Sequence, residues 1–111
     1  MISLDEFKRI ELRIGEVRAA EPMAGSERLL KLTVDFGEQT RTLVGGLAKS
    51  YSPEELLGLK VVVVTNLESA RIRGVVSEGM LLCANSSASE EAASVSLVTV
   101  HRPVANGARV R

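Results

Sequence analysis

The sequence predicts an all-β protein, a small barrel of five or six short strands with two short helices. Apolar and polar residues alternate along several segments, which is the pattern of half-buried strands. Glycine, proline and aspartate residues interrupt these segments at short intervals, as turns do. Aromatic residues make up only 3% of the 111 residues, so aliphatic side chains must fill the core. A chain of this length supports one hydrophobic core, and we expect a single domain over residues 1–111.

The N-terminus predicts a short helix. Ser3 and Glu6 have the spacing of a capping box, in which each side chain bonds the other residue's backbone N–H. The helix should run to about Lys8 and place Leu4 and Phe7 on one face.

The next segment predicts a long, bent strand. Apolar residues at positions 10, 12 and 14 alternate with charged ones, and Val17 and Ala19 resume the alternation on the other parity. We expect a β-bulge at Gly15, where the phase changes. Long bent strands allow small barrels to close.

A hairpin and a second helix follow. Residues 30–34 and 40–44 flank an Asp-Phe-Gly turn and should pair with each other. Ser52 and Glu55 form a second capping box, Pro53 occupies the first helical position and Gly58 ends the turn.

The remaining strands are short. Residues 60–65 contain four consecutive valines, as in a strand buried on both faces or in a tight barrel. A basic loop or strand at 71–74, an apolar strand at 79–83 and an exposed loop at 85–94 come next. Residues 95–100 form a last clear strand and residues 104–110 a possible extra one. This order, with a helix between the third and fourth strands, is the outline of the five-stranded OB-fold, although another small barrel would fit nearly as well.

Composition limits the possible functions. Fourteen basic residues balance fourteen acidic ones, which counts against nucleic-acid binding unless the basic groups gather on one face. The opening residues do not form a signal peptide, and the longest apolar run, at 61–64, is too short to cross a bilayer. We therefore expect a cytoplasmic protein with no membrane partner.

The sequence offers no signature of catalysis. One cysteine and one histidine, Cys83 and His101, make a metal site or a Cys–His nucleophile improbable. Cys83 lies in the apolar run 80–84, so we expect a buried, unreactive thiol. No glycine loop for phosphates is present. We expect a non-enzymatic protein that uses no cofactor and no metal.

Several segments together resemble one family. They are IELRIG (10–15), KLTVD (31–35), LVGGL (43–47), YSPEEL (51–56), VVVVTNL (61–67), RIRGV (71–75), SEGMLL (77–82) and GARVR (107–111). They are similar to the tRNA-binding domain found at the C-terminus of many methionyl-tRNA synthetases. The same domain occurs as a separate beta subunit of that enzyme and as free-standing dimeric, structure-specific tRNA-binding proteins.

The resemblance implies an OB-fold that recognises tRNA by shape and forms a homodimer. The minimal barrel would span about 10–84, with the N-terminal helix and residues 95–111 as dimerisation extensions. The RNA-binding positions that it implies are Arg28, Lys31, Arg71, Arg73, Ser77 and Met80.

Spacing gives partial support to these positions. Arg71 and Arg73 are two residues apart and point the same way in an extended chain, whereas Arg28 and Lys31, three apart, share a face only across a bend. Without the resemblance, these cations read as a solvated charge cluster, and Met80 could simply fill the core after a structural turn.

This chain departs from the family pattern in two places. Residues 23–25 read Met-Ala-Gly where relatives often carry His-Pro-Asn, and Glu78 replaces a common glutamine. A carboxylate beside the site predicts a weaker or differently tuned RNA affinity.

The function expected from the sequence is non-catalytic tRNA binding by a homodimer that assists a methionyl-tRNA synthetase in trans. Two alternatives stay open. One is an export-chaperone-like protein that binds unfolded clients on the same dimeric barrel, and the other is a purely structural dimerisation module.

Overall fold

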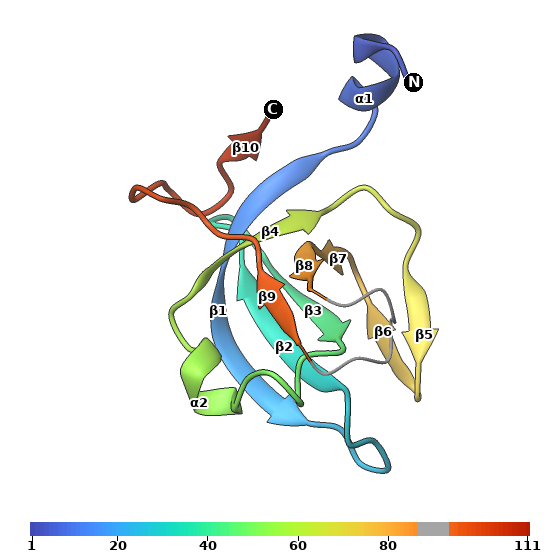
Figure 1. Cartoon of the computed structure of the whole chain (residues 1–111), viewed down its shortest axis with the longest axis vertical. Helices are drawn as coiled ribbons and strands as arrows, with labels where there is room; N and C mark the ends of the chain where they lie inside the picture. The colour runs from blue at the N-terminus through green and yellow to red at the C-terminus, as the bar shows by residue number, and fades with distance from the viewer. Residues whose placement is uncertain (87–93) are drawn as a thin grey trace.

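The computed structural model describes residues 1–86 and 94–111 (Figure 1). In chain order its elements are α1 (Leu4–Lys8), β1 (Leu12–Pro22), β2 (Leu30–Asp35), β3 (Thr40–Gly45), α2 (Pro53–Leu56), β4 (Lys60–Val64), β5 (Ala70–Ile72), β6 (Val75–Ser77), β7 (Met80–Leu81), β8 (Cys83–Asn85), β9 (Val95–Leu97) and β10 (Arg109–Val110). Of the expected loop at 85–94, residues 87–93 lie outside the described residues.

The main sheet is antiparallel and curls into a half-barrel (Figure 1). Its strands run in the order β3-β2-β1-β4-β7, and β10 pairs with the start of β1. The hairpin β5–β6 and the pair β8–β9 lie on its open side, and α2 connects β3 to β4. The predicted all-β class, the OB-like barrel and the helix between the third and fourth strands are confirmed.

Both helices begin with the capping boxes that the sequence predicts. The Ser3 hydroxyl accepts from the Glu6 N–H at 3.1 Å, and the Glu6 carboxylate accepts from the Ser3 N–H at 3.0 Å. The same exchange joins Ser52 and Glu55. Helix α1 buries none of its residues and extends beyond the barrel, so the barrel leaves its apolar side chains uncovered (Figure 1).

Two hydrophobic clusters lie on opposite faces of β1 and β4. The barrel core contains Val61 and Val63 together with the inward residues of β2 and β3. A smaller outer cluster contains Val62 and Val64 together with Leu12 and Ile14 of β1. Strand β4 is thus buried on both faces, as its four valines predict.

Strand β1 contains a bulge, although not where the sequence predicted it. The register with β2 shifts between Val17 and Ala19, beyond Gly15. The phase change near Gly15 has another cause: Ile14 faces the outer cluster, whereas Val17 faces the barrel core. Side chains on both faces of the strand are buried here, so the change of phase at Gly15 needs no bulge at that residue.

The C-terminal segment covers the outer cluster. Val100, Ala108 and Val110 pack against it, and β10 pairs with β1. Strands β9 and β10 are shorter than the expected strands at 95–100 and 104–110. Within residues 1–86 and 94–111, no helix has the length and apolar character needed to span a bilayer.

Candidate nucleic-acid interface

Three cationic side chains from distant parts of the chain line one cleft. Arg28, Lys49 and Arg73 surround a hollow of about 610 Å³. The loop 25–29, which carries Glu27, completes its wall. We call this hollow the cationic cleft. Three cations against one carboxylate give it a local excess of positive charge on a chain whose net charge is zero.

The backbone around Arg28 is held from two sides. The Ser26 hydroxyl accepts from the N–H groups of Arg28 and Leu29 at 3.3 and 3.1 Å, and the Arg28 carbonyl accepts from the Ala48 N–H at 3.0 Å. The side chain of Arg28 lies along Gly46, where a Cβ would meet its Nη1 at 3.4 Å. A side chain at position 46 would therefore crowd the guanidinium.

Lys49 is the cleft residue that sequence reasoning missed. It follows Ala48 in a tight turn, closed by a bond from the Ser50 N–H to the Leu47 carbonyl. The Ala48–Arg28 bond then places Lys49 beside the loop that carries Arg28. No motif marks Lys49 in the sequence, since only the tertiary contact of two loops brings it there.

Arg73 reaches the cleft through an unfavourable backbone conformation. It is the first residue of a two-residue turn between β5 and β6, with φ of 48°, and Gly74 follows with φ of 82°. Positive φ at both positions matches the twist of a hairpin, but for an arginine it costs about 1–2 kcal/mol. The Nη1 atom of Arg73 ends 3.5 Å from the Cβ position of Gly25, across the cleft.

Arg71 does not join Arg73, because the premise of an extended chain fails at this turn. Arg71 lies opposite Val76 in the β5–β6 hairpin, and Ser77 lies opposite Ala70. Since neighbouring residues of a strand alternate, the exposed Arg71 points away from the face on which buried Ser77 lies. It is not among the residues that line the cationic cleft.

An apolar groove continues from the cleft at Arg28, which lines both. The other residues of this groove are Val44, Gly45, Gly46, Leu47, Met80, Leu81, Leu82, Cys83, Asn85 and Val95. It runs between β3 and the β7–β8 segment. These strands contact each other but do not pair, and the half-barrel is open there. We call the hollow lined by these residues the apolar groove.

Met80 and Ser77 have different environments. Met80 is 49% exposed and lines the apolar groove, so it does not fill the core. Ser77 is only 4% exposed. Its hydroxyl accepts from the Val44 N–H at 3.1 Å and donates to the Gly79 carbonyl at 3.3 Å. These bonds join β6 to β3 and hold the turn that leads to Met80.

Lys31 lies on the outer face of β2, next to the groove. It is opposite Val44 in the register and forms an ion pair with Glu21 at 3.5 Å. Both side chains are exposed, so this pair contributes little to stability, but it partly offsets the charge of Lys31. Glu78 does not line the cleft or the groove.

Cys83 is exposed, and the prediction of a buried thiol was wrong. The run 80–84 lies at the open rim of the half-barrel, where β7 and β8 border the apolar groove. Partial burial still raises the pKa of the Cys83 thiol above its usual value.

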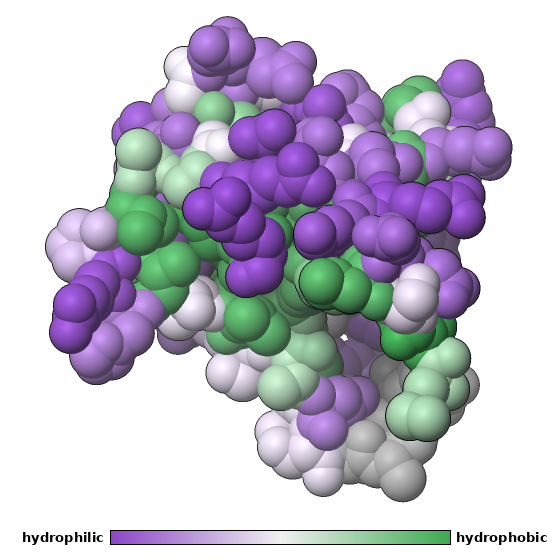
Figure 2. Space-filling model, turned by 90° about the horizontal axis from the view of Figure 1, so that it is seen from above, coloured by the Kyte–Doolittle hydropathy of each residue, from purple (hydrophilic) through white to green (hydrophobic). Residues whose placement is uncertain are grey.

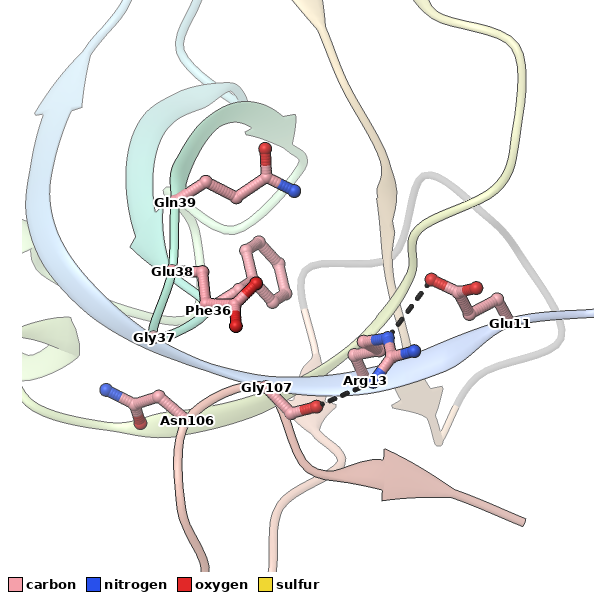
Figure 3. A pocket seen from close by; sticks show the side chains of 8 residues that line it. All are labelled: Glu11, Arg13, Phe36, Gly37, Glu38, Gln39, Asn106 and Gly107. Atoms are coloured by element: carbon pink, nitrogen blue, oxygen red, sulfur yellow. Dashed lines mark hydrogen bonds and ion pairs between the residues drawn. The ribbon is translucent and has the colours of Figure 1, made fainter.

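A second hollow, of about 410 Å³, lies where β1 meets the β2–β3 turn and the C-terminal segment (Figure 3). Its one cation, Arg13, donates to Glu11 at 3.1 Å and to the Gly107 carbonyl at 3.0 Å. Bonds from Thr65 and then from Arg13 lower the pKa of Glu11. With Arg13 paired and Glu38 on the opposite wall, this hollow lacks the positive excess of the cationic cleft (Figure 3). In the described part of the chain, no group of three or more His, Cys, Asp or Glu residues is arranged to hold a metal.

Comparisons with known proteins give the family of this chain. Residues 12–109 match the family described as "Putative tRNA binding domain". The chain is 45% identical over its full length to a segment of the methionine–tRNA ligase of Deinococcus radiodurans, and spans 16% of that enzyme's length.

Two solved structures are similar over almost their whole length. The MetRS-related protein of Pyrococcus horikoshii superposes with a TM-score of 0.89 at 40% identity, covering 100% of this chain and 98% of that one. The chaperone CsaA of Bacillus anthracis gives 0.88 at 29% identity, covering 100% and 99%. The family match over nearly all of the chain and the identity to the ligase segment lead to one conclusion: this chain belongs to the tRNA-binding domain family.

Proposed function

We propose that the chain binds tRNA without catalysing a reaction, through the cationic cleft and the adjoining apolar groove. The observation that carries this proposal is the convergence of Arg28, Lys49 and Arg73 on one side of a molecule whose net charge is zero. Phosphate contacts need cations on one face, and this cleft supplies them.

The apolar groove suits the base of a nucleotide. A phosphate held at Arg28 leaves its base close to Val44 and Met80, which offer apolar surface. Unpaired bases of RNA are recognised by stacking and by contacts to their edges, and a flexible thioether adapts to different bases. We assign Ser77 to positioning, since its hydroxyl is already bonded on both sides. Lys31 would add a weaker contact at the edge of the site, whereas Arg71 points away from it.

Binding measurements at several salt concentrations test this site. Each phosphate contact that is lost should weaken binding uniformly and reduce the slope of log affinity against log salt by about 1. We expect the double variant R28Q/R73Q to reduce the slope by about 2. The matched control is R18Q/R102Q, which removes two exposed cations outside the cleft. Equal slopes for the two double variants would contradict the proposal.

We further propose that the chain is a homodimer whose interface includes α1. Leu4 and Phe7 are 66% and 38% exposed and need a partner surface. Deleting residues 95–111 would be a poor test, because Val100 and Val110 cover the outer cluster. L4S/F7S is sharper, since α1 buries nothing in the chain itself. Sedimentation should then give monomers with unchanged thermal stability, and a dimer that survives would refute the α1 interface.

The ligase relatives support a role beside a methionyl-tRNA synthetase in the cytoplasm. Tethering or association would raise the local tRNA concentration without altering the chemistry. Added to a synthetase that lacks such a domain, the chain should lower KM for tRNA and leave kcat unchanged. If the R28Q/R73Q chain were equally effective, the benefit would not come from the cleft.

A second candidate is binding of unfolded protein, as the similarity to the Bacillus anthracis chaperone favours. The apolar groove beside β3, the end strand of the main sheet, could hold an extended segment. Competition separates the two: excess tRNA should displace an unfolded client if they share the groove, and the ligand with the lower Kd is the principal one. If neither ligand binds, a structural dimerisation module is the better account.

A further inference from the structure

Glu27 places a carboxylate on the wall of the cationic cleft. It precedes Arg28 in the loop 25–29, and both residues line the same hollow. Glu27 forms no ion pair with any residue that the structure describes, although Arg28, Lys49 and Arg73 line this hollow with it. A phosphate bound by those cations would lie near an unpaired negative charge, and like charges repel. Glu27 therefore opposes phosphate binding unless it bonds another part of the nucleotide.

The loop that carries Glu27 is held in place. Met23 and Leu29, which flank it, are both buried. The Ser26 N–H donates to the Met23 carbonyl at 3.1 Å, and the Ser26 hydroxyl accepts from the N–H groups of Arg28 and Leu29. Because the backbone is bonded on both sides of Glu27, its exposed side chain projects from a defined point of the cleft wall.

The cleft lies away from the chain ends (Figure 1). The β1–β2 loop, which carries Glu27, and the β5–β6 turn, which carries Arg73, lie towards the end of the molecule opposite α1 and the C-terminus. Seen from above, the end that carries α1 has hydrophobic areas beside hydrophilic surface (Figure 2). A homodimer that forms through α1 thus leaves Glu27 and the cleft open to RNA.

The chemistry of a carboxylate limits what Glu27 can bind. An ionised carboxylate only accepts hydrogen bonds, and the phosphate oxygens of RNA are acceptors too. The donor in an RNA backbone is the ribose 2′-hydroxyl, which distinguishes RNA from DNA. Phosphate and ribose are neighbours in RNA, as Arg28 and Glu27 are neighbours on the cleft wall. A phosphate bound at Arg28 therefore brings its ribose close to Glu27, whatever base the nucleotide carries.

We propose that Glu27 accepts a hydrogen bond from a ribose 2′-hydroxyl and makes the cationic cleft selective for RNA over DNA. This inference rests on the proposed function. The cations attract the phosphates of both nucleic acids, and the carboxylate repels the phosphates of both. The hydrogen bond to the hydroxyl offsets this repulsion in RNA alone. Arg28, Lys49 and Arg73 supply the affinity, and Glu27 supplies the selectivity.

Two synthetic hairpins of the same base sequence test this contact. One contains ribose, and the other contains 2′-fluororibose, which keeps the sugar pucker of RNA but has no 2′ hydrogen to donate. Both carry the same phosphates, so the ratio of their Kd values isolates the hydroxyl contact. The unmodified chain should bind the ribose hairpin about tenfold more tightly, as expected for one hydrogen bond to a charged group.

Variants of Glu27 should change this ratio. Glu27→Ala should bind the two hairpins equally, and should bind the fluorinated hairpin more tightly than the unmodified chain does, because the repulsion is gone. Glu27→Gln should keep a smaller preference for ribose, since its amide oxygen still accepts a hydrogen bond. The matched control is Glu68→Ala, which removes an exposed carboxylate outside the cleft and the apolar groove and should keep the tenfold preference.

Three results would overturn the inference. A preference for ribose that survives in Glu27→Ala would assign the hydroxyl contact to another residue. Equal binding of the two hairpins by the unmodified chain would mean that Glu27 does not bond the hydroxyl. Binding of tRNA without binding of either hairpin would show that the cleft does not recognise a local piece of the RNA backbone. In each case the proposed function stands if R28Q/R73Q weakens tRNA binding, and it fails if R28Q/R73Q binds tRNA like the unmodified chain.

Discussion

Replacing Ser77 by alanine separates a structural role of its hydroxyl from a direct RNA contact. The substitution leaves the Val44 N–H without an acceptor and the Gly79 carbonyl without a donor, beside a side chain that is only 4% exposed. An unsatisfied buried backbone group costs about 1–3 kcal/mol. A loss of about 2 kcal/mol reduces the ratio of folded to unfolded chain by roughly 30-fold.

This loss should be visible in unfolding and absent from binding. Urea unfolding should show the reduced stability, and Tm should fall by about 4–8 °C for each kcal/mol lost. A domain stable by about 5–15 kcal/mol remains folded after this loss, so tRNA affinity should stay the same. The control is Ser96→Ala, an exposed serine of β9, which should change stability by less than about 0.5 kcal/mol. Unchanged urea unfolding of Ser77→Ala combined with weaker tRNA binding would refute the structural assignment.

Three further predictions follow from single residues. Gly15→Ala would place its Cβ in a clash with Cγ1 of buried Val34, and should cost about 1–3 kcal/mol by overpacking, measured by urea unfolding. Glu11 has a lowered pKa in the folded chain, so the folded state binds fewer protons at this group, and stability is lost as pH falls below the ordinary glutamate value of 4.5. The Glu11→Gln variant should lose less stability than the unmodified chain across that pH range. Equal losses of stability in the two proteins would contradict this prediction. Cys83, the chain's one cysteine, should react with iodoacetamide faster as pH rises towards its elevated pKa, and saturating tRNA should slow the reaction if the apolar groove is occupied.

Local chemistry made the elements predictable. Each capping box involves residues three apart, and each bonded as expected. The pairing of β2 with β3 needed only a short turn. The valines of β4 pointed to burial on both faces, which the structure confirms. These features depend on residues that are close together in the chain, so the sequence alone is enough to predict them.

Features that depend on tertiary contacts were less predictable. The parity argument for Arg71 and Arg73 assumed extended backbone, but Arg73 has positive φ in a tight turn. Lys49 reaches the cleft through the contact between Ala48 and Arg28. Cys83 lies in an apolar run and is nevertheless exposed, because that run borders the opening of the half-barrel. Of the residues expected in the RNA site, Arg28 and Arg73 meet in the cleft and Met80 lies in the adjoining groove.

The division of β4 between two neighbourhoods makes tolerance to mutation alternate from one residue to the next. Polar replacements at Val61 or Val63 would damage the barrel itself. The same replacements at Val62 or Val64 would first detach the C-terminal segment and leave the barrel core intact. Loosening of the C-terminal segment should therefore expose the Val62 and Val64 face of this strand, while the Val61 and Val63 face stays buried in the barrel core.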